Sequence, residues 1–456
     1  MRQAQRRMCQ NPLAVAVWAG LALLALSPAP AFAIPSFARQ TGLQCATCHT
    51  VFPELTAFGR EFKLRGYTLG SVLEAKRFPY NLPLSVGLQV GNTSVNDPNK
   101  GADAAADFPR AGTTILQQVA LYYGGRVAGK LGAIAQYNWD GLDQKWGAEM
   151  IDIRYANSAT TTMGQEIVYG ASLTNSPTEG DLWATTPMWA FPHLQDAGIM
   201  PMQTSLFDMT LDNQIGDFTL YGFYGGRYYA ALGLLHNGQS GVLHLLNGDD
   251  ELTTAIDGNA PHLRLAWERD HGAYNLMLGL HALQAKIFPN PGLQSGPADR
   301  FTDFALDGQY QYTGEDSLFS VQAFLDREKR DWEASYPMMA SNPSDILDTF
   351  KANVHYWYKR KIGGGLGVFD YWGDSDILKY GMGGMPSAMD NATGSPDTRG
   401  WIIEADWLPL ENEQNLKFGL RHTTYIKFNG ASDNYNGFGR NASDNDAWFA
   451  YLWLLY

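Results

Sequence analysis

The stretch LGAIAQYNWD, residues 131–140, alternates between apolar and polar side chains. Tyr137 and Trp139 fall on one face, and Gln136 and Asn138 fall on the other. A period of two is typical of a β-strand that has one apolar and one polar face. The same alternation recurs further along the chain, at residues 150–156 and 401–407. Strands of this kind can form either a soluble β-sandwich or a membrane β-barrel.

The lengths of the connections between strands separate these two folds. Sixteen strands are expected near residues 82–92, 113–127, 130–140, 148–157, 165–173, 211–224, 228–236, 260–270, 273–284, 301–313, 317–328, 348–359, 362–373, 398–409, 414–428 and 447–456. Tight turns alternate with long loops, among which 141–147 is counted as long and 410–413 as tight. Short turns on one side, long loops on the other and an even strand number are typical of outer-membrane barrels. We therefore predict an all-β fold, an outer-membrane antiparallel β-barrel of about 16 strands.

The C-terminal stretch AWFAYLWLLY, residues 447–456, supports this fold. It ends on an aromatic residue, Tyr456, with Leu452 and Leu454 on the same face, as in the last strand of bacterial outer-membrane barrels. Because the number of strands is even and the short turns are periplasmic, the first and the last strand of the barrel both have their chain ends in the periplasm. A barrel of this size is wide enough for an aqueous lumen.

The first 33 residues have the features of a secretory signal peptide. Arg2, Arg6 and Arg7 precede an apolar run at 13–26, and Ala-Phe-Ala at 31–33 is a small-residue cleavage site. No later segment approaches the roughly 18 apolar residues that a membrane-spanning helix needs. The sequence therefore predicts an exported protein without transmembrane helices.

Removal of the signal also removes Cys9, so the mature chain contains only Cys45 and Cys48, and His49 follows directly. Two cysteines at this spacing are compatible with a disulfide, a redox pair or half of a zinc site. The adjacent histidine favours c-type haem, because C-x-x-C-H is the attachment signal for that cofactor. Cys45 and Cys48 would form the thioether bonds, and His49 would coordinate the haem iron.

Residues 34–80 are predicted to form a monohaem cytochrome c-like segment in front of a porin-like barrel at 81–456. We expect one helix from Pro35 to Thr41 and a second that starts at Pro53, with Leu55, Phe58 and Phe62 on one face. Four basic residues are available for the haem propionates: Arg39, Arg60, Lys63 and Arg65. A segment this short cannot bury a haem alone. We therefore expect it to enter the barrel from the periplasm and plug the pore.

A second axial ligand is not evident near the motif, because no histidine or methionine occurs between His49 and Met150. The haem is then open on one face, ligated by a weaker group such as Lys63, or completed from the barrel. The loop from Thr174 to Thr210 is long enough to be functional. We expect it to fold inward, with its aromatic residues shielding the haem and His193, Met200 or Met202 as possible second ligand. Strand parity also points His262, His281 and His355 into the lumen as polar lining residues, and His422 toward lipid.

Residues 34–69, IPSFARQTGLQCATCHTVFPELTAFGREFKLRGYTL, carry a specific set of short motifs. The matching pieces besides C-x-x-C-H are FARQTG at 37–42, FP at 52–53, FGR at 58–60 and FK at 62–63. This segment resembles the N-terminus of the fused monohaem cytochrome-porins, outer-membrane proteins that include oxidisers of extracellular ferrous iron. Residues 173–192, LTNSPTEGDLWATTPMWAFP, are similar to a loop of such barrels. The resemblance implies electron transfer across the outer membrane through haem c.

Net charge gives a weaker indication of the partners. The chain carries a formal charge of −13, which disfavours nucleic-acid binding. Acidic residues recur in the predicted outer loops, at Asp97, Asp103, Asp107, Asp249, Asp250, Glu251, Asp433, Asp444 and Asp446. Such clusters raise the local concentration of cations such as Fe(II). No P-loop, H-E-x-x-H or G-x-S-x-G motif is present, so any catalysis would belong to the haem.

Three functions from different classes remain open on the sequence. The first is an electron conduit that accepts electrons from an extracellular donor, Fe(II) in the leading version, and passes them to a periplasmic c-type cytochrome. Its reaction would be that of an Fe(II):cytochrome c oxidoreductase. The second is a passive porin with a structural haem plug, and the third is a peroxidase-like haem enzyme with an open distal site.

Overall fold

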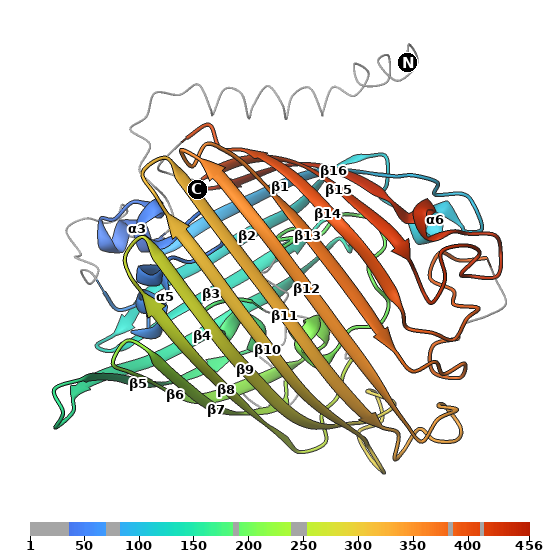
Figure 1. Ribbon diagram of the computed structural model, residues 1–456, viewed down its shortest axis with the longest axis horizontal. Coiled ribbons are helices and arrows are strands. Elements are labelled where there is room, and N and C mark those ends of the chain that lie inside the picture. The colour runs from blue at the N-terminus through green and yellow to red at the C-terminus, as the bar shows by residue number, and fades with distance from the viewer. Residues whose placement is uncertain (1–35, 70–82, 186–190, 239–252, 382–385, 411–414) are drawn as a thin grey trace.

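The computed structural model describes residues 36–69, 83–185, 191–238, 253–381, 386–410 and 415–456. The described chain forms a closed antiparallel barrel of sixteen strands, with short helices at its two ends (Figure 1). The predicted fold and strand number are therefore confirmed. The predicted signal peptide, residues 1–33, lies outside the described residues. Within the described part of the chain, no helix is long and apolar enough to span a bilayer.

Each strand pairs with its neighbours in the sequence, and β1 pairs with β16 to close the barrel. The strands are β1 (Leu84–Val95), β2 (Thr114–Ala128), β3 (Leu131–Asp140), β4 (Lys145–Thr160), β5 (Glu166–Thr174), β6 (Ile215–Tyr224), β7 (Tyr228–Asn237), β8 (Asn259–Asp270), β9 (Tyr274–Ile287), β10 (Asp299–Thr313), β11 (Ser317–Asp331), β12 (Ser344–Tyr358), β13 (Ile362–Gly373), β14 (Thr398–Trp407), β15 (Leu416–Lys427) and β16 (Ala447–Leu455). Closure leaves no strand edge unpaired, which a bilayer requires of any β-structure.

Side-chain burial follows the predicted alternation. In β3, Gln136 and Asn138 are buried inside the barrel, whereas Tyr137 is exposed on its outer surface. In β14, Glu404 and Asp406 are buried, whereas Ile403 is exposed. Apolar side chains thus cover the outside and polar side chains line the lumen, as in outer-membrane barrels.

The two ends of the barrel differ in the length of their connections. Most connections at the end that contains the start of β1 and the end of β16 are short, and we call this the turn end. The opposite, loop end carries the long connections together with α6 (Ala104–Asp107) and η4 (Ala442–Asn445). Two predicted lengths were wrong. The loop-end connection at 141–144 is short because β4 already begins at Lys145, and the turn-end connection at 408–415 is longer than expected.

Residues 36–69, which we call the plug, form three short helices at the turn end: α3 (Ser36–Thr41), α4 (Cys45–Cys48) and α5 (Ala57–Leu64). An aromatic cluster holds the plug together, because Phe37 packs against Phe62 and Tyr67 at ring-centroid distances of 5.1 and 5.3 Å. The Tyr67 hydroxyl donates a hydrogen bond to Asp152 of β4 at 2.6 Å. The plug is thus packed on itself and fastened to the barrel wall.

The second helix of the plug does not start where the sequence suggested. It begins after Thr56, whose side chain accepts a hydrogen bond from the Gly59 N–H, and not at Pro53. Leu55 therefore lies outside α5, Phe58 is exposed and Phe62 is buried. The predicted common face of these three residues does not exist, because the N-cap shifts the helix start toward the C-terminus.

Arg60 anchors the plug inside the lumen. Its guanidinium forms an ion pair with Glu268 of β8 at 2.5 Å and donates hydrogen bonds to Asn275 of β9 and to Gln309 and Gln311 of β10. Both charged side chains of the pair are buried. A buried pair of this kind holds position well, since either charge would be left uncompensated without the other.

The connection between β5 and β6, residues 175–214, folds into the lumen, as predicted, and we call it the inward loop. It contains α7 (Pro177–Gly180) and the π-helical turn η2 (Leu206–Thr210). Its hydrogen bonds reach strands around the ring: Asp181 to Arg264 of β8, Thr185 to Asp307 of β10, Ala197 to Thr93 of β1, Leu194 to Arg421 of β15 and Asp208 to Tyr371 of β13. Trp189, one of the aromatic residues predicted to shield the haem, lies outside the described residues. The loop therefore crosses the barrel interior instead of covering its outer mouth.

Candidate functional site

The C-x-x-C-H motif forms a single helical turn in the plug. The His49 N–H donates a hydrogen bond to the Cys45 carbonyl at 2.9 Å, which closes the turn. Cys45 and Cys48 are partly exposed and not joined to each other. One turn therefore presents both thiols and the following imidazole, which is the donor set that a c-type haem requires.

Two features of His49 suit its predicted role as an iron ligand. Its Nδ1 lies 3.3 Å from the carbonyl oxygen of Pro53. Burial lowers the pKa of His49 to about 4, and the backbone carbonyls of Pro53 and Glu54 offset only part of this effect. A neutral imidazole that donates from Nδ1 keeps the Nε2 lone pair free for iron.

The surroundings of Cys48 favour its protonated thiol. Burial raises the pKa of the Cys48 thiol to about 11. The alternatives of a redox pair and of half a zinc site stay open.

Helix α5 packs directly on the motif. A Cβ atom built at Gly59 would lie 2.1 Å from the Cys48 carbonyl oxygen, so only glycine permits this contact. Two large apolar side chains of the described plug, Leu43 and Phe58, are exposed on the chain that flanks the motif. Exposed apolar side chains beside the predicted attachment site provide a surface that a porphyrin could cover.

The four predicted propionate partners have distinct positions. Arg60 forms a buried ion pair with Glu268, and its role toward the haem stays a prediction. Arg65 pairs with Glu61 and Glu166 at the turn end. Arg39 donates to the Leu84 carbonyl, and Lys63 donates to the Asp181 carbonyl at 3.0 Å. Lys63 therefore joins the plug to the inward loop.

The structure separates the three candidates for the second axial ligand. His193 reaches the plug, where its Nε2 lies 3.8 Å from Glu54 Oε1. Met200 lines a cavity of about 150 Å³ within the lumen, which His193 also lines. Met202 packs against a buried cluster that includes Phe108 and Tyr435 of the loop-end connections. Their role toward the haem stays a prediction, and His193 is the candidate that contacts the plug.

The four histidines whose orientation was predicted from strand parity point as predicted. His262 pairs with Asp217 at 2.8 Å, and His281 lies 3.8 Å from Asp307, both inside the barrel. His422 stacks on the outward-facing Trp448, with ring centroids 4.4 Å apart. His355 also points inward, but its partner is Glu54 of the plug.

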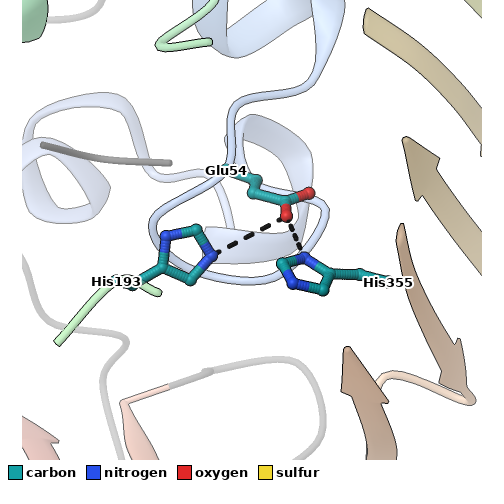
Figure 2. Close-up of side chains that lie close together, drawn as sticks. All are labelled: Glu54, His193 and His355. Atoms are coloured by element: carbon teal, nitrogen blue, oxygen red, sulfur yellow. Dashed lines mark hydrogen bonds and ion pairs between the residues drawn. The ribbon is translucent and has the colours of Figure 1, made fainter. Parts of the chain in front are cut away.

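Glu54, His193 and His355 form a cluster that the sequence did not reveal (Figure 2). Glu54 belongs to the plug, His193 to the inward loop and His355 to β12. Burial alone would raise the pKa of Glu54, but His355 and His193 hold it well below its usual range. Strand parity for His355 and the length of the loop for His193 predicted inward positions, whereas nothing in the Phe-Pro-Glu context of Glu54 indicates its partners.

The acidic residues of the outer loops serve mainly to organise the loops. Asp103 caps α6, and Asp107 accepts hydrogen bonds from Ser387 and Ala388. Asp444 pairs with Lys100 at 2.9 Å. Asp249, Asp250 and Glu251 lie outside the described residues. The described carboxylates are thus a weaker argument for cation collection than their number in the sequence suggested.

No protein-family model matches the sequence, and no curated protein matches it. Solved structures similar to this chain include OmpF of Salmonella typhi in complex with daunomycin, at 11% identity and a TM-score of 0.47, covering 82% of this chain and 97% of that one. OmpT of Vibrio cholerae is 10% identical with a TM-score of 0.41, covering 82% and 96%. An anion-selective porin from Comamonas acidovorans is 13% identical with a TM-score of 0.40, covering 82% and 98%. At these values no residue role transfers to this chain.

Proposed function

We propose that this chain is an outer-membrane electron conduit that carries one haem c on Cys45, Cys48 and His49. The observation that carries the proposal is the position of the C-x-x-C-H turn, which is built into a plug inside the mouth of a closed barrel. The bound haem supplies a reversible one-electron centre. The periplasm is the compartment at the turn end, because outer-membrane barrels have their short turns there.

The side chains of the plug and the inward loop support electron flow over solute flow. Arg60 fixes the plug to β8, β9 and β10, and Tyr67 fixes it to β4. Lys63 joins the plug to the inward loop, which crosses the lumen above it. Packing of this kind occupies the route that a solute would take, while electrons need no open channel.

Extracellular Fe(II) is the proposed donor, and a periplasmic c-type cytochrome is the proposed acceptor. Fe(II) would reach the lumen from the loop end, where the cavity lined by Met200 and His193 lies. The acceptor would approach the turn end, where the plug is located. The resemblance of residues 34–69 to iron-oxidising cytochrome-porins is consistent with this direction.

A passive porin is the second candidate, and the barrel architecture itself favours it. Sixteen-stranded barrels commonly enclose an aqueous channel. In this chain, however, the plug and the inward loop both occupy the interior. A porin with a structural haem plug would conduct ions while loaded with haem. The peroxidase-like alternative would need rapid binding of CO or cyanide.

Stopped-flow absorbance tests the conduit directly. The oxidised, detergent-solubilised protein is mixed with Fe(II), and the haem reduction bands are followed. We expect rapid reduction in the wild type and its loss in His49→Ala, while the outward-facing His422→Gln should behave like the wild type. A haem that stays oxidised although its potential permits transfer would exclude Fe(II) as donor. High ion conductance of the haem-loaded protein would favour the passive porin.

A further inference from the structure

Glu54, His193 and His355 come from three segments that are distant in the sequence and converge at one point of the lumen (Figure 2). Their donor atoms all lie within 4.8 Å of one another. The side chains of His193, Glu54 and His355 are only 6, 5 and 7% exposed. We propose that these three residues form a binding site for a divalent transition-metal cation of the first row.

The donor set suits such a cation. Nε2 of His193 and Nδ1 of His355 are both directed at the same carboxylate oxygen, Oε1 of Glu54. Two imidazoles and one carboxylate with open positions are a known ligand set for Fe(II), and imidazole also suits Zn(II) and Cu(II). Donor atoms about 2.0–2.2 Å from a metal lie roughly 3 Å apart, so small side-chain rotations would close the site.

The surrounding charges permit a cation at this point. Lys417 is the nearby cationic group that acts on both histidines. Its Nζ lies 4.0 Å from Glu404 and 4.0 Å from Asp406, so two carboxylates offset its charge. The Glu54 carboxylate therefore remains available to neutralise an incoming metal.

A cavity of the lumen adjoins the cluster on its His193 side. His193 lines this cavity of about 150 Å³, together with Met200, Asp208 and Tyr425. Its volume exceeds the roughly 30 Å³ per water of the liquid, so waters can complete the coordination sphere. Gly365 makes room for the site, because a Cβ there would lie 2.3 Å from Cδ2 of His355.

The site deepens the proposed function, on which its assignment to Fe(II) rests, whereas metal binding as such does not depend on that function. Glu54 directly follows Pro53, whose carbonyl oxygen lies 3.3 Å from His49 Nδ1. A cation on Glu54 would therefore sit one peptide unit from the partner of the proximal histidine. This position suits a donor ion that must come close to the haem segment.

Equilibrium dialysis of the metal-stripped haem protein against Zn(II), with elemental analysis, tests the binding site without any redox chemistry. We expect one Zn(II) per chain in the wild type. His193→Gln and His355→Gln should each weaken binding at least about tenfold, the lower end of what losing even an outer-shell partner costs. His262→Gln is the matched control, because His262 pairs with Asp217 inside the same lumen but belongs to no such cluster among the residues that the structure describes.

Heat-modifiable gel mobility establishes that each variant is folded. The proposal is overturned if the wild type binds no Zn(II), or if folded His193→Gln and His355→Gln bind it as the wild type does. A changed haem spectrum in His193→Gln with unaltered Zn(II) binding would also overturn it and make His193 the second haem ligand.

Competition between Zn(II) and Fe(II) tests the identity of the cation separately. Zn(II) should slow haem reduction by Fe(II) in the wild type and have no effect in His193→Gln. If Zn(II) binds but reduction is unaffected, the assignment to Fe(II) is wrong while the metal site stands. If Fe(II) does not reduce the haem at all, the proposed function fails. The Zn(II) dialysis then still shows whether the three residues bind a metal.

Discussion

At the scale of single residues, Gly59 couples helix α5 to the C-x-x-C-H turn, the proposed site of haem attachment. Its missing side chain lets the helix touch the Cys48 carbonyl, and a Cβ there would approach that oxygen to 2.1 Å. Backbone atoms cannot yield as a flexible side chain can, so α5 would have to move. The geometry of the attachment turn therefore depends on one hydrogen atom in place of a methyl group.

We predict that Gly59→Ala lowers covalent haem loading at least several-fold. Overpacking typically costs about 1–3 kcal/mol, and here the strain falls on the turn that carries both thiols. Haem stain per unit of protein on a denaturing gel measures the loading. Gly222→Ala in β6 is the control, because its Cβ would meet no atom closer than 4.0 Å. Equal loading in both variants would show that α5 need not contact the turn.

At the scale of elements, the inward loop depends on buried polar groups near its return to β6. Asp212 accepts hydrogen bonds from Ser176 at 2.6 Å and from Thr178 at 3.0 Å. Burial raises the pKa of Asp212 to about 6, although the two hydroxyl groups counteract the rise. The carboxyl group of Asp212 therefore binds the two ends of the loop together, and the folded state favours its protonated form.

The raised pKa of Asp212 predicts a pH-dependent stability of the loop. Because the folded-state pKa lies above the unfolded one, the contribution is complete below about pH 4 and is lost as the pH rises through about 6. Asp212→Asn should remove this part of the pH dependence. At pH 7 it should raise the free energy of unfolding by about 1–3 kcal/mol and therefore also the melting temperature. Thermal melts between pH 4 and 8 measure both effects. The exposed Asp143→Asn is the control, and an unchanged pH profile in Asp212→Asn would contradict the prediction.

At the scale of the whole molecule, two inserts, the plug and the inward loop, occupy the lumen of the barrel. The plug enters at the turn end and the inward loop crosses the lumen, and they meet through Lys63 and Asp181 and through Glu54 and His193. Arg60 and Glu268 carry the buried charge pair that seats the plug. Ion conductance reports on this arrangement.

We predict that the wild type conducts ions poorly in planar bilayers and that Arg60→Leu shows channel openings. The substitution leaves Glu268 buried without its partner, which costs about 3–5 kcal/mol and should unseat the plug in a measurable fraction of molecules. Arg65→Gln is the matched control, since its half-exposed ion pairs contribute at most about 1 kcal/mol. Openings that are absent from Arg60→Leu, or equally frequent in Arg65→Gln, would mean that Arg60 does not hold the plug.

The sequence by itself determined the barrel and the helical turn of the C-x-x-C-H motif. Alternation with a period of two is a local property, so Gln136 and Tyr137 reveal their faces without any partner strand. The strand count and the two kinds of chain connection follow from the same local signal. Cys45, Cys48 and His49 are adjacent in the chain, so their common turn was also readable. The predicted start of α5 was wrong. Proline is common at the first position of a helix, which favoured Pro53, but here the Thr56 side chain caps the helix.

Only the tertiary structure decided which lumen side chains meet. Arg60 finds Glu268, and Glu54 finds His193 and His355, across separations that depend on strand register and on the path of the inward loop. Strand parity can direct a side chain into the lumen, but it does not say which residue of another segment stands opposite. The plug and the inward loop fill the lumen and the strands line it, so the ion pairs and the proposed metal site form only once the barrel has closed around the two inserts.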